Sequence, residues 1–293
     1  MDQKKEKIIL TIFTDPMMGL SYEMEPVFRK LETHFPDQID IIPCMNVLVK
    51  DVYDFVDQSD LSKGREYALQ NYLKKLADIY KSEEEISGMP IHMDGFRLFS
   101  KEYPSSFPLC LAYKAAELAD RDRAGCFLYH LRYATVAECR PTTQLEEILA
   151  VVQRTGIDQK AFLQEYHGDR AEKALDEDRK LGRQLRIRSL PAYLIRYQDR
   201  AMLFQTFSYQ DFVSMIEKIS QGNIRPVSVS ATEDTLRKLL TAHPLISPIE
   251  IREAFDLRDM DEVKQCLQPF LERQEIRIRN VAPGWFVERR EPM

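Results

Sequence analysis

The chain has 293 residues, of which 44% are hydrophobic and 30% are charged, and its formal net charge is −6. This length predicts two domains, or one large domain with an appendage. The negative net charge gives no general electrostatic reason to expect binding to nucleic acid or to an anionic membrane. Because the sequence has no run of about 18 apolar residues, we expect no membrane span.

The N-terminal part predicts a strand, a tight turn and a helix. The β-branched run at 8–13 is typical of a buried strand, and Asp15-Pro16 ends it. Apolar side chains then recur at helical spacing from Met24 to Phe35. The first turn of such a helix presents free backbone N–H groups and the positive end of the helix dipole. We therefore expect a functional site at this turn.

Two features predict a cytoplasmic protein with reduced thiols. The apolar run at 8–13 is too short for a signal peptide, and no small-residue cleavage site follows it. The five cysteines include no C-x-x-C pair, which favours buried thiols over a disulfide framework. They also lack metal-ligand spacing with any of the five histidines. We expect neither a metal nor another cofactor.

The middle of the chain predicts a second strand, a helical block and a second strand-and-helix unit. Between 49 and 167, apolar residues recur at three- and four-residue spacing. The predicted elements around this block are a strand at 38–45, a helix at 170–186, a strand at 187–195, a turn at 198–200, a strand at 201–207 and a helix at 209–220. This order is that of an α/β thioredoxin fold with an all-helical insertion.

The last part of the chain predicts a small separate domain. A Gly-, Pro- and Ser-containing linker at 222–230 is followed by three short helical patterns and by a hairpin with its turn at Pro283-Gly284. Three helices and a hairpin in about 60 residues resemble a winged helix. We expect one domain at 1–225, with its insertion at about 50–168, and a second at 228–293.

The stretch from Asp15 to Pro26 resembles the active-site signature of the DsbA family, in its cytosolic FrnE-like branch. That signature reads Asp-Pro-Met-Cys-x-x-Cys-Tyr/Trp-x-x-Glu-Pro, and both cysteine positions are replaced here, by Met18 and Ser21. The stretch 189–193 matches the loop that carries the family's cis-proline. Two further stretches, 88–91 and 105–116, look like segments of the helical insertion in FrnE-like proteins. The resemblance covers roughly 8–222 and implies a thioredoxin fold of the DsbA type.

The replaced cysteines argue against the thiol–disulfide oxidoreductase or isomerase activity of this family. Dithiol–disulfide exchange needs a thiolate at the helix N-terminus and a second cysteine to resolve the mixed disulfide. Met18 has no ionisable proton, and Ser21 is a weak nucleophile with no histidine base nearby in sequence. A divergent oxidoreductase would need another thiol, such as Cys110, but a lone cysteine in an apolar stretch favours a buried hydrophobe. We expect no catalytic residue at Met18 or Ser21.

The leading hypothesis is a cytoplasmic protein-binding or adaptor protein. The resemblance implies this role, because some cytosolic members of the wider DsbA-like group present proteins to proteases. An extended peptide could lie beside the cis-proline loop, against apolar side chains of the degenerate site. The predicted peptide-binding residues are Met17, Met18, Gly19, Leu20, Ser21, Tyr22, Leu190 and Pro191.

A third hypothesis is a DNA-linked regulator that acts through the C-terminal domain. Residues 228–293 hold 10 Lys and Arg against 12 Asp and Glu, a net charge of −2. The predicted recognition helix at 259–274 is also acidic, which argues against nucleic acid because phosphate neutralisation supplies much of DNA affinity. The arginines of the hairpin keep the idea open: Arg277, Arg279, Arg289 and Arg290. We favour contact with protein.

Overall fold

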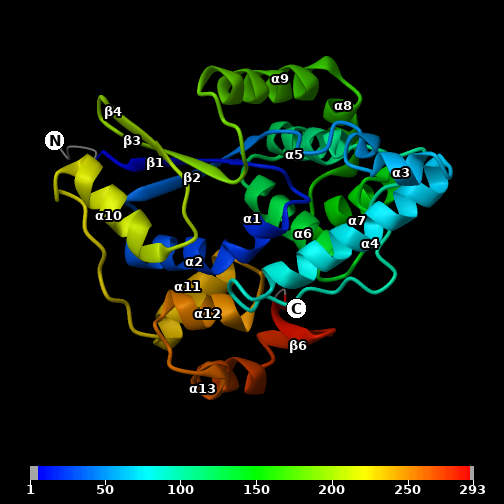
Figure 1. The fold of residues 1–293 in the computed structure, drawn as a ribbon. Coiled ribbons are helices and arrows are strands. Elements are labelled where there is room, and N and C mark those ends of the chain that lie inside the picture. The colour runs from blue at the N-terminus through cyan, green and yellow to red at the C-terminus, as the bar shows by residue number, and fades with distance from the viewer. Residues whose placement is uncertain (1–5, 291–293) are drawn as a thin grey trace.

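A computed structural model describes residues 6–290 (Figure 1). Its strands and helices confirm the predicted mixed α/β fold. The elements in chain order are β1 (Ile8–Thr14), α1 (Gly19–Glu23), α2 (Glu25–His34), β2 (Ile39–Met45), a 3-10 turn η1 (Val52–Asp54), α3 (Gln58–Leu61), α4 (Arg65–Glu83), α5 (Phe107–Ala119), α6 (Ala124–Val136), α7 (Leu145–Thr155), α8 (Gln159–Tyr166), α9 (Asp169–Gln184), β3 (Ala192–Tyr197), β4 (Arg200–Phe204), α10 (Tyr209–Ser220), α11 (Glu233–Ala242), β5 (Leu245–Ile246), α12 (Pro248–Ala254), α13 (Met260–Glu272), β6 (Ile276–Val281) and β7 (Gly284–Arg289).

The first domain is built on a four-stranded sheet in the order β2-β1-β3-β4. Strand β1 runs parallel to β2 and antiparallel to β3, so that Phe13 pairs with Cys44 on one side and with Ala192 on the other. Pro43 is tolerated within β2 because this strand lies at the edge of the sheet. The central strand β1 is buried almost throughout, as its β-branched run predicted.

Helices cover both faces of this sheet. On one face, Phe28 of α2 and Phe212 of α10 pack against Leu10 and Tyr193. On the other face, Leu181 and other apolar residues that end α9 pack against Phe13. Successive side chains of a strand point to opposite faces, so β1 contributes to both cores. The arrangement is a helix–sheet–helix sandwich that places the end of β1 at the border of the insertion (Figure 1).

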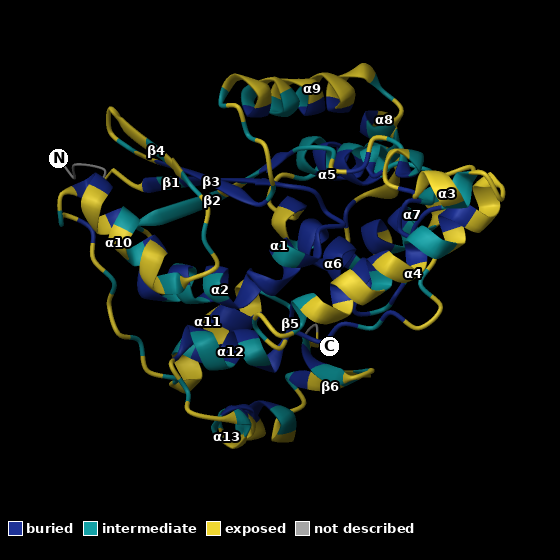
Figure 2. Cartoon of the chain, viewed as in Figure 1, coloured by how far each residue is buried: buried dark blue, intermediate teal, exposed yellow. Residues whose placement is uncertain are grey.

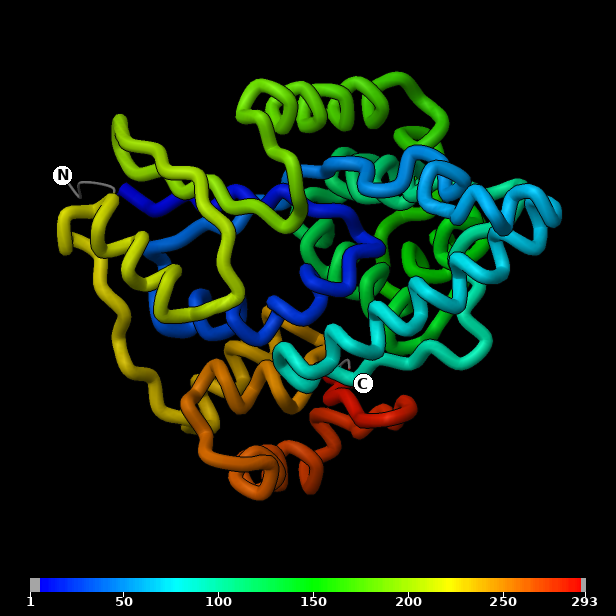
Figure 3. The backbone as a smooth tube through the Cα atoms, in the orientation of Figure 1, coloured from blue at the N-terminus to red at the C-terminus, as the bar shows by residue number. Residues whose placement is uncertain are grey.

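The insertion between β2 and β3 has its own hydrophobic core, formed mainly by α4, α5, α6, α7 and α8. The structure differs from the sequence prediction at 84–106, which holds no helix or strand. Gly88, Pro90, Gly95 and Pro104 interrupt the helical pattern there. The chain turns back after α4 in this segment (Figure 3), and buried Met89, Ile91, Met93, Leu98 and Phe99 fix it to the core.

The C-terminal part packs three helices, α11, α12 and α13, with a small sheet in the order β5-β7-β6. Thr232 and Ser247 cap the helices that follow them. The buried side of α12 faces α2 of the first domain (Figure 2), and Val227 of the connecting segment donates its N–H to the carbonyl of His34. The two domains therefore form one packed body. The winged-helix assignment and the domain boundaries stay predictions.

Candidate functional site

The turn between β1 and α1 is held by the buried carboxyl of Asp15. One of its oxygens accepts the N–H of Met17 at 3.0 Å. The other accepts the N–H of Leu48 at 2.8 Å and the hydroxyl of Ser106 at 2.6 Å. Burial raises the pKa of Asp15, although these donors oppose the shift. Asp15 thus ties the turn to the segment after β2 and to the start of α5.

The two residues that stand where the DsbA-type signature has its cysteines are both buried. Met18 precedes α1 and is 7% exposed, and Ser21 is fully buried. The hydroxyl of Thr14 donates to Ser21 Oγ at 2.8 Å. Neither side chain is placed to attack a disulfide in a partner, because neither reaches the surface and neither carries a thiol.

Helix α4 of the insertion lies directly on the start of α1. The Tyr80 hydroxyl donates to the carbonyl of Met17. The two helices approach each other closely at Gly19, which has no side chain. A Cβ at this position would come within 2.7 Å of the Tyr80 ring and 1.9 Å of a Glu83 oxygen. Glu83 is itself partly buried, which raises its pKa to about 7. The insertion therefore covers the start of α1 at Gly19, between the two replaced cysteine positions.

Of the eight predicted peptide-binding residues, only Leu20 and Leu190 keep part of their surface exposed. Met17 and Tyr22 belong to the core of the insertion, and the Tyr22 hydroxyl donates to the carbonyl of Pro90 at 2.9 Å. A peptide-binding role for the Met17–Tyr22 stretch stays a prediction. In the structure, most of its side chains pack inward.

The Leu190–Pro191 peptide bond is cis. Because Ala192 pairs with Phe13 in the antiparallel register, Pro191 lies alongside the end of β1 that leads into Asp15 and Met18. The side chain of Gln205 donates to the carbonyls of Pro191 at 2.9 Å and Ser189 at 3.2 Å. The structure therefore brings the two stretches of the resemblance, the signature and the proline loop, to the same end of the sheet.

None of the five cysteines lies in an environment that favours its thiolate form. Burial raises the pKa of each of them. For Cys110, the nearby carboxyl of Asp15 at 3.5 Å raises the pKa further. A thiolate is the nucleophile in disulfide exchange, so these environments suppress that chemistry. Among residues 6–290, no group of three or more His, Cys, Asp and Glu side chains is arranged to hold a metal.

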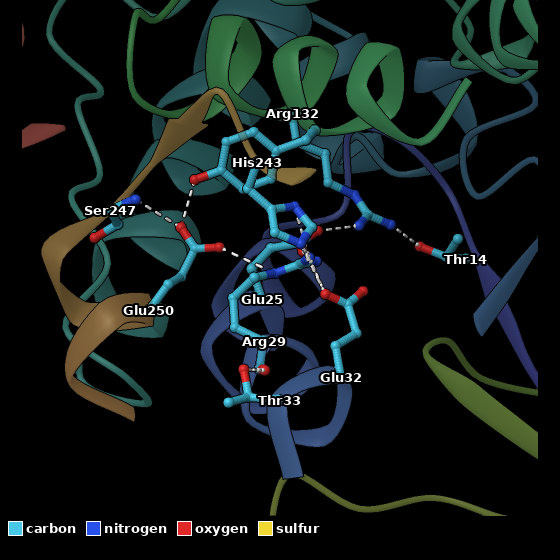
Figure 4. A network of polar contacts seen from close by, with 10 residues as sticks. Thr14, Glu25, Arg29, Glu32, Thr33, Arg132, His243, Ser247 and Glu250 are labelled. Carbon is cyan, nitrogen blue, oxygen red and sulfur yellow. Dashed lines mark hydrogen bonds and ion pairs between the residues drawn. The ribbon is translucent and has the colours of Figure 1, made fainter. Parts of the chain in front are cut away.

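Behind the degenerate site lies a buried polar network that the sequence analysis missed (Figure 4). Arg132 of α6 donates to Thr14 Oγ1 at 2.9 Å and to Glu25 at 2.6 Å. Glu25 in turn accepts from Arg29 at 2.9 Å, and Arg29 Nε lies 3.3 Å from Glu250 in the C-terminal domain. A continuous polar path therefore links Ser21, through Thr14, to all three parts of the chain.

The same network is completed by groups from α6 and the C-terminal domain. The Tyr129 hydroxyl and the Ser247 N–H donate to one oxygen of Glu250, at 2.5 and 2.7 Å. His243 accepts from Arg29 and lies 2.8 Å from Glu32. Burial raises the pKa of Glu250 to about 8 and lowers the pKa of His243. These residues are far apart in sequence, and no local motif connects them.

The fold and the site together define a thioredoxin-type protein with a DsbA-like helical insertion, whose cysteine pair is replaced. The model of a family described as thioredoxin matches residues 11–207, and the chain belongs to this family. None of the helices described for residues 6–290 is both long and apolar enough to cross a bilayer.

Two curated relatives align along almost the whole chain. The protein named "ClpXP adapter protein SpxH" of Halalkalibacterium halodurans is 24% identical over 293 residues, which cover 97% of this chain and 90% of that protein. The protein of the same name from Shouchella clausii is 22% identical, and the alignment covers 93% of this chain and 85% of that protein.

Solved structures share the fold at low sequence identity. A putative protein disulfide isomerase from Nitrosomonas europaea superposes with a TM-score of 0.59 at 14% identity, over 74% of this chain and all of that one. A probable DsbA oxidoreductase from Streptomyces coelicolor gives 0.55 at 16% identity, over 78% of this chain and 97% of that one. These likenesses confirm the DsbA-like fold, whereas the narrower FrnE-like assignment stays a prediction.

Proposed function

We propose that this chain is a protein-binding adaptor rather than a thiol oxidoreductase. The observation that carries the proposal is that Met18 and Ser21 stand at the positions of the two cysteines and are both buried. The remaining thiols are held in environments that raise their pKa, so none supplies a thiolate at the degenerate site. The adapter names of the two curated relatives support the same role.

The partner-binding surface that we propose is the β4 face, defined as Leu190, Leu203, Phe207 and the backbone of β4. Leu203 and Phe207 are 46% and 47% exposed, and a groove of about 290 Å³ separates Leu203 from the stretch 186–189. Among residues 6–290, strand β4 pairs with β3 alone, so its outer edge offers backbone groups to an extended segment of a partner. Arg186 and Arg188 beside the groove favour an acidic segment.

Affinity capture tests this surface directly. The tagged chain is compared with Leu190→Asp/Leu203→Asp in a native lysate, and Ile79→Asp serves as the control because Ile79 is 50% exposed on α4, outside the β4 face. We expect the double variant to lose specific partners that the chain and the control both retain. Unchanged capture by the double variant, with an unchanged unfolding midpoint, would contradict a partner site on the β4 face.

We further propose that the adaptor delivers its bound protein to a ClpXP-type protease in the cytoplasm. This step rests on the names of the relatives. It is compatible with the C-terminal domain, whose helix α13 carries exposed Asp261 and Glu272. An acidic helix favours a protein surface over the phosphates of DNA. DNA binding is therefore the less favoured alternative for this domain.

A further inference from the structure

A second concave region lies between α6 and the junction of α11 with β5. Two adjoining cavities, of about 240 and 590 Å³, share Asp122, Cys126, His130, Ala242 and Pro244 in their walls. We call this continuous space the α6 cleft, with an inner chamber toward α2 and an outer chamber toward the C-terminal hairpin. Its size is in the range of pockets that bind small molecules.

The outer chamber is strongly basic, in a chain whose net charge is −6. Five arginines line it, against the two carboxylates of Asp122 and Glu288; the arginines are Arg123, Arg154, Arg277, Arg289 and Arg290. Arg277 pairs with Glu288, whereas Arg154 pairs with Glu138 and Arg123 with Asp120, both outside the chamber. Within residues 6–290, Arg289 and Arg290 have no ion-pair partner. Guanidinium groups gathered in this way favour a multiply charged anion such as a phosphate.

His130 stands where the two chambers meet. Its side chain is 6% exposed, and its Nδ1 has no hydrogen-bond partner among the described residues. Burial and then Arg154 lower the pKa of His130 to about 3, so the imidazole is neutral and can exchange hydrogen bonds with a ligand. A buried polar nitrogen without a partner is costly, and a polar ligand atom in the cleft would offset that cost.

The inner chamber differs from the outer one, because much of its wall is apolar and its carboxyl groups outnumber its guanidinium groups. Phe28, Ile41, Leu128 and Leu245 contribute to its wall. The two arginines that also line it are paired with Glu25 and Glu32. An uncharged, apolar or aromatic group is the complement of such a chamber.

From these observations we propose that the α6 cleft binds a small organic phosphate, which goes beyond the adaptor role. Its phosphate lies among Arg154, Arg289 and Arg290, and its apolar body passes His130 into the inner chamber. The site is distinct from the degenerate cysteine positions and from the β4 face, so its ligand would act on the adaptor from elsewhere in the molecule.

Two half-buried cysteines allow ligand binding in the α6 cleft to be tested within one molecule. Cys126 lines both chambers, whereas Cys266 belongs to the core of the C-terminal domain and lines neither. Alkylation of each thiol is followed by mass spectrometry at constant ionic strength, with phenyl phosphate as the probe. At a concentration ten times the dissociation constant, we expect alkylation of Cys126 to slow by about tenfold, in proportion to the free cleft. Cys266 should react at its original rate.

Further probes and variants separate the parts of the proposal. Inorganic phosphate and benzoate should protect Cys126 less than phenyl phosphate does, and benzyl alcohol should not protect it. Arg289→Ala/Arg290→Ala should weaken phenyl phosphate binding by about tenfold or more, in line with the loss of charge-assisted hydrogen bonds. The control is Arg170→Ala/Arg258→Ala, because both of those side chains are mostly exposed and lie outside the cleft.

Several outcomes would overturn the proposal. The first is that millimolar phenyl phosphate does not protect Cys126 from alkylation. The second is that alkylation of Cys126 and of Cys266 slows equally. The third is that Cys126 is protected equally in the natural chain and in Arg289→Ala/Arg290→Ala. Protection by an acidic peptide alone would assign the basic chamber to a protein contact instead. Because Arg289 and Arg290 are exposed, their replacement should leave the fold intact, which circular dichroism checks.

Discussion

Arg29 of α2 and Glu250 of α12 lie 3.3 Å apart, from Nε to Oε1, although α2 follows the first strand of the chain and α12 lies in its C-terminal part. Their side chains are 8% and 0% exposed. Arg132, Glu25 and Glu32 belong to the same network. With Arg29 and Glu250 included, it holds two guanidinium groups and three carboxyls. Burying a net charge is costly. Burial raises the pKa of Glu250 to about 8, and a proton on this carboxyl would balance the charges of the network.

The first prediction concerns the docking of the two domains. Arg29→Met leaves the carboxyls of this network without their central cation, so we expect a loss of about 3–5 kcal/mol of stability. Urea denaturation followed by circular dichroism measures it. The control is Arg258→Met, which removes an exposed pair with Glu262 and should change the midpoint little. Equal midpoints for the two variants would show that the network does not hold the domains.

The second prediction concerns pH. The Glu250 carboxyl titrates near 4.5 when unfolded and near 8 when folded. Between these values the folded state keeps a proton that the unfolded state has lost, so this stabilising contribution is complete below pH 4.5 and disappears as the pH rises through 8. Glu250→Gln removes this titration. Its urea midpoint should therefore fall less steeply than that of the natural chain between pH 5 and 8, whereas parallel curves would refute the shifted pKa.

The third prediction tests the cover over the degenerate site. In Gly19→Ala, the new methyl group meets the Tyr80 ring and the Glu83 carboxyl, so we expect a cost of about 1–3 kcal/mol from overpacking. The matched control is Gly125→Ala in α6, where nothing lies within 4 Å of the new Cβ. That change should be neutral or stabilising, because alanine favours helix. A tolerated Gly19→Ala would mean that α4 does not press on α1.

The fourth prediction concerns redox chemistry. The natural chain should reduce insulin disulfides no faster than a buffer control, because Met18 and Ser21 carry no thiol and Cys110 is buried. Met18→Cys/Ser21→Cys should form its own disulfide with a small oxidant. It should still turn over a protein substrate slowly, because Tyr80 and Glu83 cover the helix start. Activity in the natural chain that is lost in Cys110→Ser would instead support the divergent oxidoreductase.

The sequence predicted those features that depend on local patterns. The β-branched run of β1 and the break at Asp15-Pro16 each act over a few residues, and the structure confirms them. The secondary structure of the segment 84–106 was harder to predict. Its buried apolar residues resemble a helical pattern, although Gly and Pro prevent a helix.

The burial of the site could not be predicted in this way. Gly19 meets Tyr80 and Glu83 across about 60 residues of sequence, and Arg29 meets His243 across more than 200. Such contacts depend on how the insertion and the C-terminal domain pack, and no periodicity records that packing. The expectation that a peptide could lie against apolar side chains of the degenerate site relied on the turn alone, whereas Met17 and Met18 are buried in the structure.

The proposed delivery of a bound protein for degradation is tested most directly by the half-life of each captured partner in cells that lack the chain. These cells are complemented with the natural sequence, with Leu190→Asp/Leu203→Asp or with Ile79→Asp. We expect at least one partner to be degraded slowly without the chain and with the double variant, and rapidly with the other two. Equal half-lives in all four cells, for partners that still bind the natural chain, would contradict the adaptor function.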